Sequence, residues 1–93
     1  MSNATDHIEL GELTLVNGRP TFTARAGAMS GQVELDNAAV FKLLRQVQPN
    51  TLLNDIEQHR GRIRMAAQRL IEGGFGLADK GSIRLIVTAL DIT

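Results

Sequence analysis

An Asn-Gly pair at positions 17 and 18, flanked by two alternating segments, is the feature that most narrows the folds open to this chain. Residues 8–16 and 21–26 alternate apolar and polar side chains, which is typical of strands with one buried face. Asn-Gly adopts positive φ at little cost and favours a two-residue hairpin turn. A third segment of this kind covers residues 32–36. The sequence therefore predicts an antiparallel meander of three strands.

The first predicted strand contains one break in its alternation. Leu10 and Leu13 lie on opposite phases, so a regular strand would expose one of them. An extra residue at Gly11-Glu12 would return both leucines to the same face. We therefore expect a β-bulge there.

Helical spacing replaces the alternation after the third strand. Asp36 or Asn37 is suited to cap a first helix that runs to about Val47, with a buried apolar stripe formed by Val40, Phe41, Leu44 and Val47. A second, longer helix is expected from about Thr51 to the Gly73-Gly74 pair, which ends it.

The closing segment, residues 82–92, reads as a fourth strand with two apolar faces. One face carries Ile83, Leu85, Val87 and Ala89, and the other carries Ile86, Leu90 and Ile92. Two interpretations stay open. The strand is central and covered by a helix and by the chain's termini, or its second face forms a subunit interface across the open side of the sheet.

These elements predict an α+β fold: a two-layer sandwich with a four-stranded, mostly antiparallel sheet and two helices on one face. A chain of 93 residues has room for one core, so we expect a single domain over residues 8–93 after a flexible segment, residues 1–7. Whether Ser2-Asn3-Ala4 is native or a tag remnant is left open. The apolar runs are too short to cross a membrane, which excludes a membrane partner.

Composition narrows the function classes. Ten basic and ten acidic residues give a formal net charge of zero, which removes the overall attraction that non-specific nucleic-acid binding needs. The chain has no cysteine, which excludes disulfides, thiolate catalysis and cysteine-ligated metals. A small cysteine-free domain without an apolar leader is typical of the cytoplasm.

The second half of the chain combines three features: the pair His59-Arg60, the helical pattern Ile63, Ala66-Ala67 and Leu70-Ile71, and a glycine-rich loop followed by an apolar strand. In these features the chain resembles a family of small bacterial proteins, number 1488 among the catalogued domains of unknown function. This resemblance extends over roughly residues 20–92. The resemblance implies a meander, two helices and a return strand, and it implies no activity.

Four arginines within ten residues of the second helix are the best candidates for contact with a ligand or partner: Arg60, Arg62, Arg64 and Arg69. Guanidinium groups suit phosphates, but these four lie on two faces of the helix, and Glu57 is near enough to pair with Arg60. A solvated helix face is therefore favoured over a nucleic-acid site. His59, beside the apolar stripe, is a proton carrier or, as the sequence favours, a boundary residue with a backbone partner.

No catalytic, metal or cofactor site is predicted. The glycines at 73–76 follow a helix and lead into a strand, which is the wrong order for a phosphate loop. None of the serines lies in a nucleophile motif. The sequence therefore favours a non-catalytic interaction or accessory protein that forms a homodimer through the sheet or through Ile86, Leu90 and Ile92. The alternative is a nucleic-acid-binding regulator that uses the arginines of the second helix.

Overall fold

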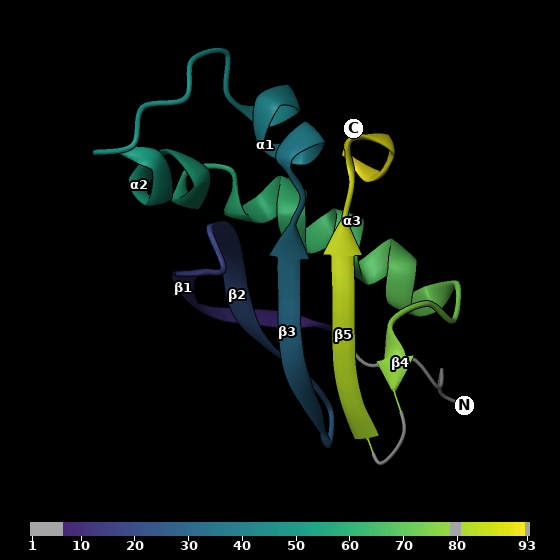
Figure 1. Cartoon of the computed structure of the whole chain (residues 1–93). Helices are drawn as coiled ribbons and strands as arrows, with labels where there is room; N and C mark the ends of the chain where they lie inside the picture. The colour runs from purple at the N-terminus through teal and green to yellow at the C-terminus, as the bar shows by residue number, and fades with distance from the viewer. Residues whose placement is uncertain (1–6, 79–80, 93) are drawn as a thin grey trace.

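The computed structural model describes residues 7–78 and 81–92 and has the expected α+β architecture (Figure 1). Most of the predicted flexible segment lies outside the described residues; His7, which is described, is exposed. The elements follow in the order β1 (Glu9–Val16), β2 (Arg19–Ala26), β3 (Met29–Leu35), α1 (Asn37–Leu43), α2 (Leu52–Glu57), α3 (Arg60–Glu72), β4 (Leu77–Ala78), β5 (Ser82–Val87) and the 3-10 turn η2 (Ala89–Asp91).

The sheet has the strand order β1-β2-β3-β5-β4. The three-strand meander is confirmed, since β1, β2 and β3 pair antiparallel in sequence order. The sheet is mostly antiparallel as predicted, but β5 lies parallel to β3 because the helices carry the chain back to the start of the sheet. A two-residue strand that was not predicted, β4, pairs antiparallel with the start of β5.

The predicted hairpin and bulge are both present. Asn17 and Gly18 have φ angles of 53° and 80°, the two positive values that a two-residue hairpin turn requires. The register of β1 against β2 shifts between Leu10 and Leu13. Both leucines therefore reach the covered side of the sheet, where they pack against the core. The third strand begins at Met29, three residues earlier than predicted.

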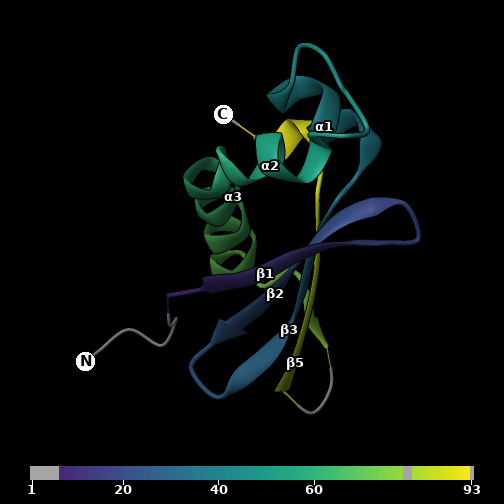
Figure 2. The same ribbon diagram turned by 90° about the vertical axis from the view of Figure 1, so that its left-hand side faces the viewer.

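The helices lie on one side of the sheet, which confirms the two-layer sandwich (Figure 2). The covered face contributes alternate residues of each strand, so a row across three strands consists of Phe22, Val33 and Leu85, all buried. From the helical layer the core takes Ala39, Val40, Ile56, Ile63, Ala66, Ala67 and Ile71. None of the helices in the described residues lies on the opposite face of the sheet.

The helices differ from the prediction in length and number. Asp36 caps α1, its side chain accepting a hydrogen bond from the backbone N–H of Ala39 at 2.8 Å, but α1 ends at Leu43 instead of near Val47. The predicted long helix is two helices, because the chain turns at residues 58 and 59. The break lets α2 pack against β1 while α3 crosses from β1 to β5.

The prediction that residues 82–92 form one strand with two apolar faces is wrong. The strand ends at Val87, because the side chain of Asp91 accepts hydrogen bonds from the backbone N–H and the hydroxyl of Thr88 and closes a capping box. After this turn Ile92 points back into the core and is 1% exposed, so it cannot belong to an interface.

Candidate functional site

Arg60, the first residue of α3, is engaged by its own chain. Its Nη1 donates to the carbonyl oxygen of Leu10 at 2.6 Å and its Nη2 to that of Gly11 at 2.9 Å. Its Nε and Nη2 also pair with the carboxylate of Glu57. The guanidinium carbon lies 5.1 Å from the centre of the Phe22 ring, within cation–π range.

The pair formed by Arg60 and Glu57 changes the acidity of both groups. The hydrogen bond from Arg60 lowers the pKa of Glu57 below its ordinary value, while slight burial opposes the shift. The same hydrogen bond raises the pKa of Arg60. Both side chains keep more than a third of their surface in water, so the pair fixes the orientation of the guanidinium more than it adds stability.

Two further side chains of α3 bind the backbone of Ile8, the residue that precedes β1. The backbone N–H of Ile8 donates to Oε1 of Gln68 at 2.8 Å, and Nη1 of Arg64 lies 3.4 Å from the Ile8 carbonyl oxygen. Because β1 is an edge strand, these backbone groups would otherwise lack partners or attract another strand. Arg60 therefore covers the outer edge of β1, and Arg64 and Gln68 hold the residue that leads into it.

The remaining sequence-predicted site residues do not join this group. The Nη2 atom of Arg69 donates to the carbonyl oxygen of Asp91 at 3.0 Å and ties α3 to η2. His59 precedes α3, is half-buried, and its Nδ1 lies 3.5 Å from Nη1 of Arg62. Arg62 itself is exposed. The four arginines and His59 therefore form no common pocket, and three of the arginines bind backbone carbonyls of their own chain.

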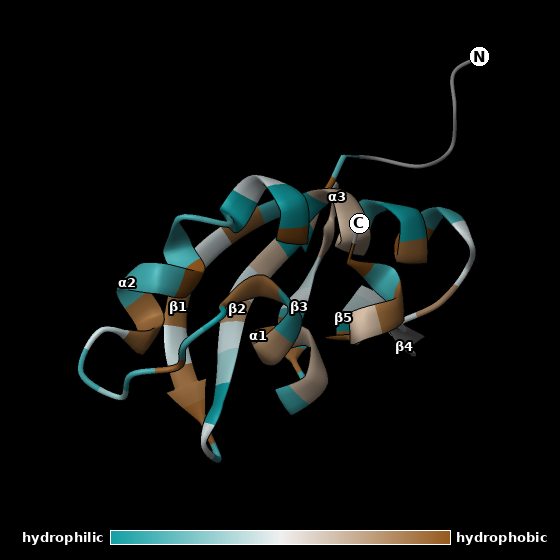
Figure 3. Cartoon of the chain, turned by 90° about the horizontal axis from the view of Figure 1, so that it is seen from above, coloured by the Kyte–Doolittle hydropathy of each residue, from teal (hydrophilic) through white to brown (hydrophobic). Residues whose placement is uncertain are grey.

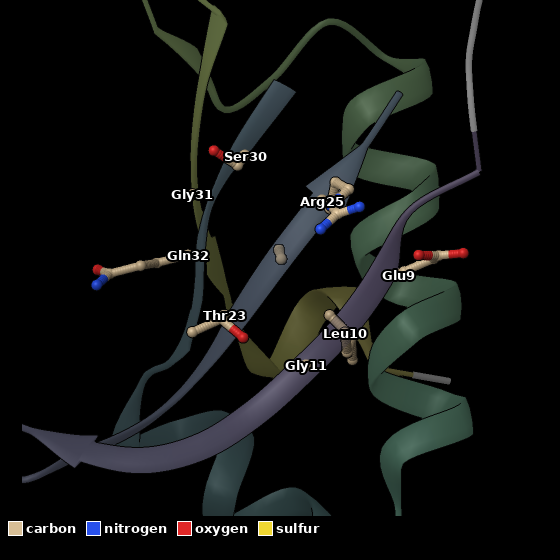
Figure 4. Close-up of a pocket in the computed structure, with 9 residues that line it drawn as sticks. Glu9, Leu10, Gly11, Thr23, Arg25, Ser30, Gly31 and Gln32 are labelled. Carbon is tan, nitrogen blue, oxygen red and sulfur yellow. The ribbon is translucent and has the colours of Figure 1, made fainter. Parts of the chain in front are cut away.

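The open face of the sheet carries a group of polar side chains that the sequence did not single out. Register places them in two rows across β2, β3 and β5: Thr23, Gln32 and Arg84 in one row, and Arg25, Ser30 and Ser82 in the next. We call these six residues the polar rectangle. All six are exposed. Figure 4 shows Ser30 and Gln32 leaving β3 on the same side, with Arg25 over β2.

A hollow of about 610 Å³ lies over part of this rectangle. It is lined by Glu9, Leu10, Gly11, Thr23, Ala24, Arg25, Ser30, Gly31 and Gln32. A second hollow of about 140 Å³ shares Gln32 with it and extends to Arg84 and Ile86. Gly31 has no room for a side chain, since a Cβ there would fall 1.9 Å from the carbonyl oxygen of Ile83.

The acidic residues next to the rectangle leave its arginines unpaired. Glu34 accepts a hydrogen bond from Arg19 at 2.6 Å, an interaction that raises the pKa of Arg19. Glu9 is the cross-strand neighbour of Arg25, but its carboxylate points away from that guanidinium in Figure 4. Among the described residues, no hydrogen bond or ion pair engages the guanidinium of Arg25 or of Arg84.

Three exposed apolar side chains belong to the elements at the end of the parallel strands β3 and β5. The chain continues from β3 into α1 and from β5 into η2, and Nζ of Lys42 joins the two by donating to the Ala89 carbonyl oxygen at 2.9 Å. Figure 3, seen from this end, shows α1 beside the C-terminal turn. Phe41 is 66% exposed, Ile86 54% and Leu90 93%. We call these three residues the apolar end; Phe41 was expected in the buried stripe of its helix.

We also searched the described part of the chain for a metal site and for a membrane-spanning helix. Its His, Asp and Glu side chains form no group of three or more that could hold a metal ion. None of its helices has the length and apolarity that crossing a membrane requires. Comparisons of the chain with models of protein families, with curated proteins and with solved structures found no match.

Proposed function

We propose that this chain is a small non-catalytic interaction domain that self-associates through the apolar end. The observation that carries the proposal is the exposure of Phe41, Ile86 and Leu90 on elements that leave the sheet at the same end. Soluble proteins expose single apolar side chains routinely, but several on adjoining elements are typical of a contact surface.

A second copy of the chain is the partner that this surface fits. The formal net charge of zero means that two copies do not repel each other as whole molecules. A two-fold axis through the apolar end would place Leu90 of one copy against the same patch of the other, as in most homodimers. Ile92, part of the interface expected from sequence, is replaced in this proposal by Phe41.

The size of the patch predicts a weak association. A stable interface covers about 800 Å² on each partner, which three side chains do not supply alone. Polar residues around them must complete the contact, and they contribute less per unit area. We therefore expect a dissociation constant in the micromolar range and a monomer at high dilution.

The alternative, a nucleic-acid-binding regulator that uses the arginines of α3, has less support. Arg60, Arg64 and Arg69 direct donors at backbone carbonyls of their own chain, which leaves fewer of them for phosphate. The resemblance to family 1488 and the cytoplasmic location stay predictions, and both are compatible with a small accessory domain.

Sedimentation velocity of the full chain, from about ten micromolar to several hundred micromolar, tests the proposal. We expect the weight-average sedimentation coefficient to rise with concentration. Leu90→Glu should suppress this rise, because it places a charge at the centre of the patch. Met65→Glu is the matched control, since Met65 is an exposed apolar residue on α3, away from the apolar end.

The two variants separate specific association from general stickiness. An unchanged rise in Met65→Glu and a lost rise in Leu90→Glu support the apolar end as the interface. A monomer at every concentration contradicts self-association. Equal loss in both variants contradicts the assignment to this patch.

A further inference from the structure

We infer that the polar rectangle on the open face of the sheet binds a ligand with linked phosphate groups. This site differs from the proposed dimer interface, although Ile86 of the apolar end lines the smaller hollow together with Arg84. The rectangle extends from there toward the start of β5, whereas Phe41 and Leu90 lie beyond the end of the parallel strands. Its residues are Thr23, Arg25, Ser30, Gln32, Ser82 and Arg84.

The chemistry of the six side chains selects an anion. Two are guanidinium groups, which carry only donors, and four are hydroxyl or amide groups that can donate as well. None is acidic, and the nearest acid on β3, Glu34, is already paired with Arg19. Among the described residues, Arg25 and Arg84 are therefore two positive charges with no hydrogen-bond or ion-pair partner, although the carboxylates of Glu9 and Glu34 line the hollows beside them.

The register selects a ligand with more than one charge. Arg25 and Arg84 occupy opposite corners of the rectangle, two strands and two residues apart. Strand spacing and rise put their Cα atoms roughly 12 Å from each other. Two linked phosphates match this separation better than a single carboxylate, and guanidinium forks pair well with phosphate oxygens.

A hollow over part of the rectangle leaves space for such a ligand. It measures about 610 Å³, and four of the six residues line it: Thr23, Arg25, Ser30 and Gln32. Among the described aromatic residues, Phe22 is buried on the covered face, and Phe41 and Phe75 lie outside the strands. No aromatic ring is therefore placed on this face to stack on a base, so the phosphate groups are the part of the ligand that is recognised.

Isothermal titration of the full chain with inorganic pyrophosphate in low salt tests the inference. We expect saturable binding by the wild type. The double variant Arg25→Ala/Arg84→Ala should weaken it at least roughly tenfold, since both charge-assisted contacts are removed. Arg45→Ala is the matched control, because Arg45 is an exposed arginine that lies outside the sheet. Thermal unfolding of each variant checks that the fold is kept.

A second variant distinguishes loss of the binding site from a folding defect in the double variant. Ser30→Asp leaves both arginines in place and introduces a negative charge between them, so it should also abolish pyrophosphate binding. A parallel titration with a single-stranded oligothymidylate distinguishes the source of the phosphates. Tighter binding of the oligonucleotide, lost in the same variants, identifies a nucleic-acid backbone; tighter binding of pyrophosphate identifies a small phosphorylated ligand.

The outcomes that overturn the inference are equally direct. It fails if the wild type binds neither pyrophosphate nor the oligonucleotide at millimolar concentration. It also fails if Arg45→Ala loses as much affinity as the double variant, because binding then follows net charge alone. Repeating the titration with Leu90→Glu keeps this result independent of self-association.

Discussion

Arg60 on α3 and Arg84 on β5 are both guanidinium groups near the surface, yet the fold uses them in opposite ways. Arg60 binds two carbonyl oxygens of β1, a carboxylate and the face of Phe22. Arg84 lies on an open sheet face, and its guanidinium has no hydrogen-bond or ion-pair partner among the described residues. Arg60 therefore helps to hold the fold together, whereas Arg84 is available to bind a ligand.

This contrast shows that a cluster of arginines in the sequence need not form a binding surface in the folded protein. The α3 arginines are close in sequence, but the helix directs them to separate tasks at the β1 edge and at η2. Arg25 and Arg84 are far apart in sequence, and the sheet register places them on one face. Pairing of strands, rather than helical spacing, assembles the exposed cationic group.

The largest expected effect is on stability, from Arg60→Ala. The substitution removes charge-assisted hydrogen bonds to Leu10 and Gly11 and leaves their carbonyl groups at a bare strand edge. We expect the free energy of unfolding to fall by about 2 kcal/mol. Urea denaturation measures the change, and Arg60→Lys should lie between the wild type and Arg60→Ala because it retains the charge without the fork. A loss below about 0.5 kcal/mol for Arg60→Ala would contradict the view that Arg60 stabilises the fold and Arg84 does not.

A smaller effect is expected on the pH dependence of stability, because Glu57 titrates differently in the folded and unfolded states. Its pKa is lowered in the folded state, so its ion pair stabilises the protein above the unfolded-state pKa, near the ordinary value of 4.5, and that contribution is lost as pH falls through the folded-state value. The stability difference between the wild type and Glu57→Gln should therefore be present at neutral pH and shrink on acidification. Denaturation of both proteins at several pH values measures it. A difference that grows in acid would contradict the pair.

The smallest expected effect is on the stability of Arg25→Ala and Arg84→Ala. Neither substitution breaks a hydrogen bond or ion pair among the described residues, so each should change the free energy of unfolding by less than about 0.5 kcal/mol. The same denaturation experiment serves as the measurement. A clear destabilisation by either variant would show that the open face also holds the fold together, and the contrast with Arg60 would disappear.

The sequence predicted local features well where one residue pattern decides them. Asn17-Gly18 specified the hairpin, the shift between Leu10 and Leu13 specified the bulge, and Asp36 specified the start of α1. The parallel pairing of β3 with β5 could not be predicted from the sequence, because apolar and polar residues alternate in the same way in parallel and antiparallel strands. The early end of β5 had a signal that was overlooked: Thr88 and Asp91 have the spacing of a capping box.

The candidate sites were harder to predict for the same reason. Arg25 and Arg84 belong to different predicted strands, and only the register shows that they share two neighbouring rows. Ile86 was expected on an outer apolar face and is exposed there, but Leu90 leaves the strand and Ile92 returns to the core. The arginines of α3 were predicted to contact a ligand or partner because the sequence does not reveal that the edge of a strand lies beside them.

The place of β5 inside the sheet has a consequence for synthesis. This strand follows the other four strands along the described part of the chain, yet it lies between β3 and β4, and Ile92 beyond it is buried in the core. Until β5 has been translated, β3 lacks its parallel neighbour and α3 lacks one of the two strands against which it packs. We therefore expect the core to close only when β5 and Ile92 are present, and a product cut short before β5 to expose the edge of β3.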